Sequence, residues 1–237
     1  MCRWCIWLVG IDPGDLRKMP EVLQRVEAVK KFRLESIAPS TRDHAATPSL
    51  FRDRNHPDSF IVVPRVSSET RKYIPMGFFD HDSIASDTCM IIPNGTVYHF
   101  GILTSTMHMA WTRCVCGRLK SDYRYSKDIV YNNFPWPNPT AKQKAAIERA
   151  AQDVLDIRKK FPNASLADLY DPVAMPHALI KAHQKLDKVV ESAYGRSFDG
   201  GIHADDSQRV VFLFELYQKL AGELFVKGKK GKGRKGE

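Results

Sequence analysis

The spacing of apolar and polar positions divides the N-terminal part of the chain into short elements. Residues 3–9 are mostly apolar and predict a first β-strand. From Pro20, the apolar residues Val22, Val26, Val29 and Leu34 recur at helical spacing and predict an amphipathic helix. Pro39 and Pro48 then bracket a loop or a short helix.

The next block is rich in β-branched and aromatic residues. Four segments in it predict β-strands, at residues 60–63, 73–79, 84–92 and 96–100. A polar connection at 67–72 separates the first two, and Pro93, Asn94 and Gly95 form a turn before the fourth. The short links predict an antiparallel, curled sheet.

The period changes to that of a helix after Gly101. Apolar residues recur at every fourth position and predict a core helix, with Leu103, Met107, Trp111, Val115 and Leu119 on its buried face. The opposite side carries Ser105, His108, Thr112, Arg113 and Cys116, which we expect to be available for binding.

The C-terminal third predicts helices only. Residues 134–139 contain three prolines, which exclude a helix and suggest a rigid linker. Thr140 and Gln143 form a capping-box pattern that opens a helix to about Lys160, and further helices begin near Pro176 and Asp205. The predicted fold class is α+β: an antiparallel β-rich domain with a core helix at 1–137, followed by an all-helical domain at 138–226.

The formal charge of +9 is concentrated at the C-terminal end. From Lys227 onward, six cationic side chains stand against Glu237, which leaves +5 in a segment that alternates lysine with glycine. Such a segment buries nothing, so 227–237 is predicted to be disordered. It is either a solubilising tail or a nonspecific contact for a polyanion.

The five cysteines and the absence of a long apolar run bear on location and metal binding. No apolar run is long enough to span a bilayer, so we expect a soluble, cytoplasmic protein without a membrane partner. Reduced, buried thiols are favoured over a zinc site built from Cys2, Cys5, Cys114 and Cys116, because alternate positions on a helix point to different sides. No metal site is predicted.

Residues 113–127 carry the most informative chemistry. Cations lie among hydroxyls and aromatic rings, a mixture that suits phosphate contacts, and the candidates are Arg113, Arg118, Lys120, Tyr123 and Arg124. The alternative is a solvated helix end whose tyrosines pack on the core.

A second candidate is the connection at residues 65–72, interpreted as a hairpin tip that enters a DNA groove. Arginine can bridge guanine, and glutamate can accept from cytosine. The candidates that would read base edges are Arg65, Ser67, Ser68, Glu69, Arg71 and Lys72, together with Ser105 and His108 on the exposed side of the core helix. An ordinary polar hairpin end is the alternative.

The sequence lacks the motifs expected for methyl transfer or DNA cleavage. The chain has no Asn/Asp-Pro-Pro-aromatic motif to hold a flipped base, and no glycine-rich turn after a strand for a nucleotide-like cofactor. Glu69-Thr70-Arg71 lacks the lysine and the strand that a metal-dependent nuclease would need. We therefore predict no catalytic residue in this chain.

Several longer motifs resemble one family. They are GRLKSDYRYS at 117–126, VYNNFPWP at 130–137, VPRVSSE at 63–69, YIPMGF at 73–78 and LYDP at 169–172, with Met175-Pro176, Leu179 and Ala182-His183. These are similar to the C-terminal region of MmeI-like type II restriction–modification DNA adenine methyltransferases, and the resemblance covers nearly everything except the lysine-glycine tail.

The resemblance implies a division of labour. The chain would be a target-recognition domain with its C-terminal helical domain, binding double-stranded DNA. The endonuclease and the methyltransferase domain would precede it, and S-adenosylmethionine would bind there and not in this chain. A free-standing specificity subunit that docks on a separate methyltransferase, and an RNA-binding module, remain open.

Overall fold

The computed structural model describes residues 4–52, 54, 57–196 and 206–231. By its internal contacts the chain divides into two compact units, 1–56 and 57–237, which are described separately. In the described part, no helix is both long enough and apolar enough to cross a membrane.

The first unit is helical. It contains α1 (Pro13–Arg17), α2 (Pro20–Leu34), α3 (Pro39–Asp43) and the short η1 (His44–Ala46). The guanidinium of Arg33 donates to the carbonyl oxygens of His44, Thr47 and Leu50 at 2.9, 2.9 and 2.8 Å, which holds the following loop against α2. The helix predicted from Pro20 is confirmed, but its predicted apolar face is not buried, since Val29 and Leu34 are exposed.

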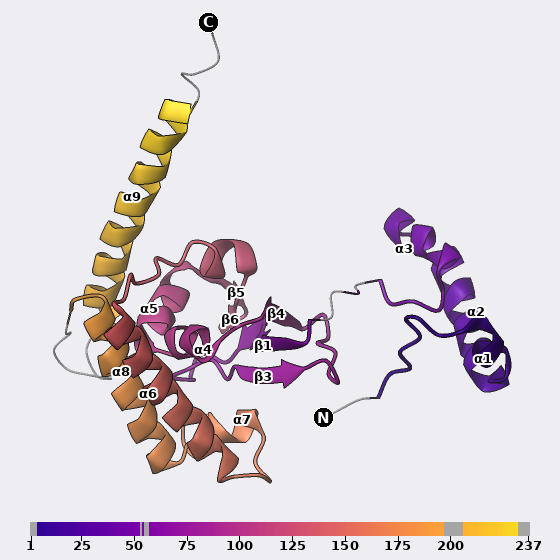
Figure 1. Cartoon of the computed structure of the whole chain (residues 1–237), viewed down its shortest axis with the longest axis horizontal. Helices are drawn as coiled ribbons and strands as arrows, with labels where there is room; N and C mark the ends of the chain where they lie inside the picture. The colour runs from indigo at the N-terminus through magenta and orange to yellow at the C-terminus, as the bar shows by residue number, and fades with distance from the viewer. Residues whose placement is uncertain (1–3, 53, 55–56, 197–205, 232–237) are drawn as a thin grey trace, which may run out of the picture. The chain divides into compact units, whose positions relative to one another are not determined.

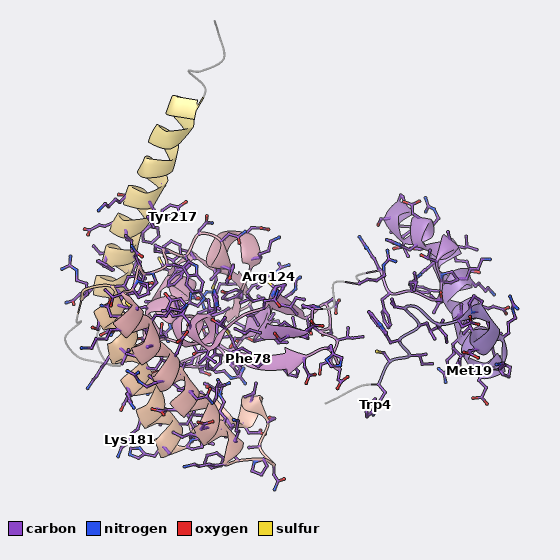
Figure 2. The ribbon with its side chains drawn as sticks, viewed as in Figure 1. Trp4, Met19, Phe78, Arg124, Lys181 and Tyr217 are labelled. Carbon is purple, nitrogen blue, oxygen red and sulfur yellow. The ribbon has the colours of Figure 1, made fainter. Side chains whose placement is uncertain are left out.

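The strand predicted at residues 3–9 is wrong for the part that the structure describes. Residues 4–8 form no strand, because the described residues of this unit include no strand that could pair with them. Ile6 and Leu8 instead line a shallow groove with α2 residues and Phe51, and Trp4 is fully exposed (Figure 2). Apolar composition alone does not make a strand without a pairing partner.

The second unit begins with an antiparallel sheet of three strands, β1 (Ser59–Pro64), β3 (Gly77–Asp80) and β4 (Cys89–Pro93), in the order β3-β1-β4. Ile61 pairs with Phe78 on one side and with Ile92 on the other. The first predicted strand is confirmed, whereas the second and third begin several residues later than predicted. The chain from Tyr73 to Met76 is not part of a strand, since the Met76 N–H donates to the Ile74 carbonyl, and Tyr73, Ile74 and Met76 are buried in the core.

The fourth predicted strand is wrong, since these residues open helix α4 (Val97–Leu103). Thr96 and His99 form a capping box, in which the His99 Nδ1 lies 3.1 Å from the Thr96 backbone nitrogen and 2.8 Å from its hydroxyl oxygen. The cap satisfies the free end of the helix, and Phe100 and Leu103 are buried. Cap and packing together override the β-propensity of Val97 and Tyr98.

The single core helix predicted from Gly101 is two helices and a strand. Helix α5 (Thr106–Val115) begins after a break at Thr104 and Ser105, where the Ser105 hydroxyl caps it. Met107 and Trp111 are buried as predicted, but the chain leaves the helix at Cys116, and Leu119 is exposed on a strand.

A second antiparallel sheet, here called the small sheet, follows. It comprises β2 (Val66–Ser67), β6 (Asp122–Arg124) and β5 (Gly117–Leu119), in the order β2-β6-β5. The one-turn π-helix η2 (Lys127–Tyr131) comes next. The alternative of a solvated helix end at 113–127 is therefore wrong beyond Val115, but its expectation that the tyrosines pack on the core is confirmed, because Tyr123 and Tyr125 are buried.

The remaining elements are helices: α6 (Ala141–Lys159), α7 (Leu166–Leu169), α8 (His177–Ala193) and α9 (Asp206–Gly231). Helices α6 and α8 pack side by side, α4 packs on α6, and α5 contacts α9 (Figure 1). The capping box at Thr140 and Gln143 is confirmed. The fold is thus α+β followed by helices, as predicted.

Two further expectations need correction. The proline-rich segment is not helical, as predicted, but it is not a free linker, because Phe134 is buried and its ring contacts Trp111 and Trp136. Helix α9 continues to Gly231, so 227–231 of the tail predicted as disordered is helical, and the rest of that tail lies outside the described residues.

Candidate nucleic-acid interface

The small sheet joins the two stretches that the sequence singled out. Val66 pairs with Arg124, and Ser67 pairs with Tyr123, so the beginning of the 65–72 segment lies beside the hairpin formed by β5 and β6. On the other edge of β6, Gly117 of β5 pairs with Arg124, and Arg118 pairs with Tyr123. The 65–72 segment is not the tip of a hairpin with β3, because it leaves β1 and pairs in another sheet.

The two faces of the small sheet differ in exposure. Residues paired across a sheet share a face. Ser67 and Tyr123 are buried, and so face the core, whereas Val66 and Arg124 on the other face are exposed. The exposed face therefore offers an apolar side chain beside a guanidinium.

Five of the predicted cations are exposed on or next to this sheet: Arg65, Lys72, Arg118, Lys120 and Arg124. Within the part of the chain that the structure describes, none of the five forms an ion pair with a carboxylate. Glu69 is exposed as well, and Ser68 and Arg71 are half-buried. Arg124 shares one face of the sheet with Val66, whereas Arg118 shares the other face with Tyr123. The region around the sheet thus has a positive excess, with the carboxylates of Glu69 and the half-buried Asp122 beside it.

Contacts within the protein hold this surface in shape. The guanidinium of Arg118 lies 4.3 Å from the centre of the Tyr123 ring and donates to the Ser121 carbonyl at 3.0 Å. The Tyr123 hydroxyl donates to the Glu69 carbonyl at 3.2 Å, which ties the 65–72 segment to β6. Tyr123 is thus a supporting residue, because its ring is covered and cannot stack on a base.

Lys120 occupies the turn between β5 and β6 with a φ of +56°. This left-handed conformation disfavours residues with a Cβ, and tight hairpin turns usually take asparagine or glycine there. The turn presents the lysine side chain at the exposed end of the hairpin.

Arg113 is engaged inside the protein. Its guanidinium forms an ion pair with Asp206 at 2.6 Å and donates to the Lys72 carbonyl at 3.3 Å. It is half-buried, so its charge is neutralised by α9 and its donors hold the end of the 65–72 segment.

The prediction that Ser105 and His108 are exposed is wrong, since both are fully buried. The Ser105 hydroxyl donates to the Ile102 carbonyl at 2.7 Å. His108 Nε2 lies 2.9 Å from the Tyr125 hydroxyl, and its ring stands edge-on to Phe134. Burial lowers the pKa of His108 to about 3, so this imidazole is neutral. Residues 106–112 of α5 are buried, so the side of this helix that the sequence suggested for binding faces the interior of the protein.

Sequence reasoning missed Val66, which is 40% exposed on the edge strand β2 of the small sheet. The available signal was an apolar, β-branched residue between the polar residues Arg65 and Ser67. Apolar side chains at such a position can contact the methyl group of thymine.

The described residues hold no group of three or more His, Cys, Asp or Glu side chains close enough to bind a metal ion. The expectation of buried thiols is wrong for Cys5 and Cys114, which are exposed, while Cys89 and Cys116 are half-buried. Cys2 lies outside the described residues.

Comparisons with known proteins show the family of the chain. The family model described as "MmeI, target recognition domain" matches residues 1–138, and "MmeI, C-terminal domain" matches residues 139–225. DNA methyltransferase A of Bacillus subtilis (strain 168) is 40% identical over 220 residues, which are 92% of this chain and 24% of the relative.

A solved structure of the type IIL restriction–modification enzyme MmeI in complex with DNA is also similar, with a TM-score of 0.87 and 48% identity. The likeness covers 92% of this chain and 29% of that one, so the chain spans between a quarter and a third of the length of these two relatives. The chain therefore belongs to the MmeI target-recognition family, and it corresponds to the target-recognition and C-terminal part of a restriction–modification enzyme.

Proposed function

We propose that the small sheet and the 65–72 segment bind double-stranded DNA and select its sequence. The observation that carries this proposal is that two cationic stretches, far apart in the sequence, come together in one small sheet through the pairing of β2 with β6. Arg118, Lys120 and Arg124 would contact phosphates. Base edges would be read by the exposed side chains of the 65–72 segment, including Val66.

The chemistry of these side chains fits a duplex. Lysine and arginine neutralise phosphates and set the position of a protein on DNA without reading its sequence. Arginine pairs with guanine in the major groove, and a carboxylate accepts from cytosine, so Arg65, Arg71 and Glu69 could supply direct readout. The similar MmeI structure is itself a complex with DNA.

Bond-making belongs, in this proposal, to a methyltransferase domain outside the chain. That domain would bind S-adenosylmethionine and transfer the methyl group to adenine, while this chain selects the site. Such an assembly would act on DNA in the bacterial cytoplasm. The similarity to part of a DNA methyltransferase supports this division.

The phosphate assignment can be tested with Lys120→Ala and Arg118→Ala in the full chain. Each substitution should weaken binding to duplexes of any sequence and lower the slope of log affinity against log salt by about 1. Fluorescence anisotropy with a labelled duplex at several salt concentrations measures both quantities.

Lys181→Ala on α8 is the matched control, because Lys181 is an exposed lysine well separated from Arg124 (Figure 2). It should leave the slope unchanged. Equal slopes for Lys120→Ala and Lys181→Ala would remove the small sheet as the phosphate contact. A preference for structured RNA over duplex DNA in competition would favour an RNA-binding module instead.

A further inference from the structure

A buried hydrogen-bond network begins where the 65–72 segment ends. Tyr73 follows Lys72 directly, and its hydroxyl donates to Oδ2 of Asp187 on α8 at 2.7 Å. The Tyr73 ring stacks on His183, also on α8, with ring centres 4.0 Å apart. One face of α8 thus fixes the first residue after the segment.

The second oxygen of the same carboxylate holds α5. Oδ1 of Asp187 accepts from the backbone N–H of Thr106 at 2.8 Å, at the first residue of α5. Near the other end of α5, Arg113 donates to the carbonyl oxygen of Lys72. Asp187 therefore connects to the end of the segment by two routes, directly through Tyr73 and indirectly through α5.

The network continues beneath the chain that leaves the segment. Arg158 of α6 donates to the Met76 carbonyl at 2.7 Å and to the Tyr170 hydroxyl at 2.9 Å. That hydroxyl lies 2.7 Å from Nε2 of His183. Residues that the family models assign to the C-terminal domain thereby hold the residues 73–76 of the target-recognition domain.

Stability alone does not account for a carboxylate in this position. Asp187 is 6% exposed, and its burial raises its pKa to about 7, which is a sign of the cost of a charge removed from water. Apolar side chains of similar volume would hold helices together as well as a buried polar network does. Apolar contacts do not fix the orientation of the groups they join, whereas hydrogen bonds to the carboxylate orient the Tyr73 hydroxyl and the N-terminus of α5.

We propose that Asp187, acting through Tyr73 and Thr106, is a positioning residue that sets the geometry of the 65–72 segment for base readout. This inference rests on the proposed function. A positioning residue of this kind governs discrimination between sequences and leaves phosphate contacts on the small sheet intact.

Tyr73→Phe and Asp187→Asn in the full chain test the inference. The probes are a duplex selected by the wild-type chain from a randomised pool and a shuffled duplex of the same composition. Each variant should lower the ratio of the two affinities by about tenfold, which corresponds to ~1.4 kcal/mol. Affinity for the shuffled duplex and its salt dependence should stay unchanged, and the double variant should lose no more discrimination than the single ones.

Tyr194→Phe is the matched control, since it also removes one tyrosine hydroxyl hydrogen bond, a part-buried one from the C-cap residue of α8 to the Pro135 carbonyl, away from the segment. It should lower the melting temperature without changing the ratio. If Tyr73→Phe also lowers the melting temperature without changing the ratio, the role of the network is merely structural and the inference is overturned. The result for Tyr73→Phe tests the inference even if Asp187→Asn fails to fold. A wild-type chain that binds no duplex would overturn the proposed function itself.

Discussion

Lys120 combines an unfavourable backbone conformation with a side chain that we propose contacts phosphate. Its left-handed backbone costs a residue with a Cβ ~1–2 kcal/mol, and glycine recovers this at an entropic cost of ~0.5–1 kcal/mol. Lys120→Gly should therefore stabilise the chain by about 0.5 kcal/mol while weakening duplex binding. Urea unfolding and anisotropy measure the two effects.

The matched control is Asn94→Gly, because Asn94 also has a positive φ, of +54°, but lies in the turn before α4. It should alter stability only slightly, since asparagine tolerates this conformation, and should leave DNA binding unchanged. Unweakened binding by Lys120→Gly would show that the lysine side chain contributes nothing to the interface.

Three buried groups give the fold a pH dependence whose signs oppose one another. Burial lowers the pKa of His108 and of His183 from 6.5 to about 3, so the unfolded state binds their protons more readily, and stability falls as pH drops from 6.5 towards 3. Burial raises the pKa of Asp187 from 3.8 to about 7, so its contribution is full below 3.8 and is lost as pH rises towards 7.

Asp187→Asn should accordingly make the stability of the chain rise more steeply between pH 4 and 6.5, because the two histidines then act without the opposing effect of this carboxyl group. One proton of difference corresponds to ~1.4 kcal/mol per pH unit. Urea unfolding at a series of pH values gives the curves. Parallel curves for wild type and variant would show that Asp187 does not titrate between these limits.

At the scale of elements, Gly101 permits the close approach of α4 to α6 and α8. A Cβ on Gly101 would stand 2.9 Å from Cγ2 of Ile147 and 3.1 Å from Cβ of Ala151. Overpacking costs ~1–3 kcal/mol, which exceeds the ~1 kcal/mol that alanine gains in helix propensity. Gly101→Ala should destabilise the chain in thermal unfolding.

Gly222 in α9 provides the opposite case, because a Cβ there would meet nothing within 4 Å. Gly222→Ala should raise stability by ~0.5–1 kcal/mol through propensity alone. If both substitutions raise the melting temperature, the packing at α4 is looser than the distances indicate.

Elements that depend on local signals were predictable, and those that depend on distant partners were not. The capping box at Thr140 and Gln143 located the start of α6, because the cap is a local arrangement of side chains. The same kind of cap at Thr96 went unrecognised, since His99 takes the place of the usual glutamate or glutamine. Residues 3–9 have a strand-like composition, but pairing is a property of two segments.

At the scale of the whole molecule, residue types identified the candidate surface, but its assembly was hidden. Charges and hydroxyls marked the 65–72 segment and the 113–127 stretch separately. The pairing of Val66 with Arg124 joins them, and this long-range contact leaves no trace in the local period. The same limit explains the error at His108, whose exposure depends on α8, α9 and η2 packing around α5.

The division of the chain at Pro57 leads to the last prediction. The small sheet, the 65–72 segment, Asp187 and the hydrophobic core that supports them all belong to the unit 57–237. A domain with its own core can fold alone. The fragment 57–237 should therefore unfold cooperatively in thermal circular dichroism and bind duplex DNA with a salt slope that Lys120→Ala lowers, as in the full chain. A fragment that folds but has lost its affinity for duplexes would assign part of the DNA contact to residues 1–56, whereas one that fails to fold would show that the N-terminal unit is needed for stability.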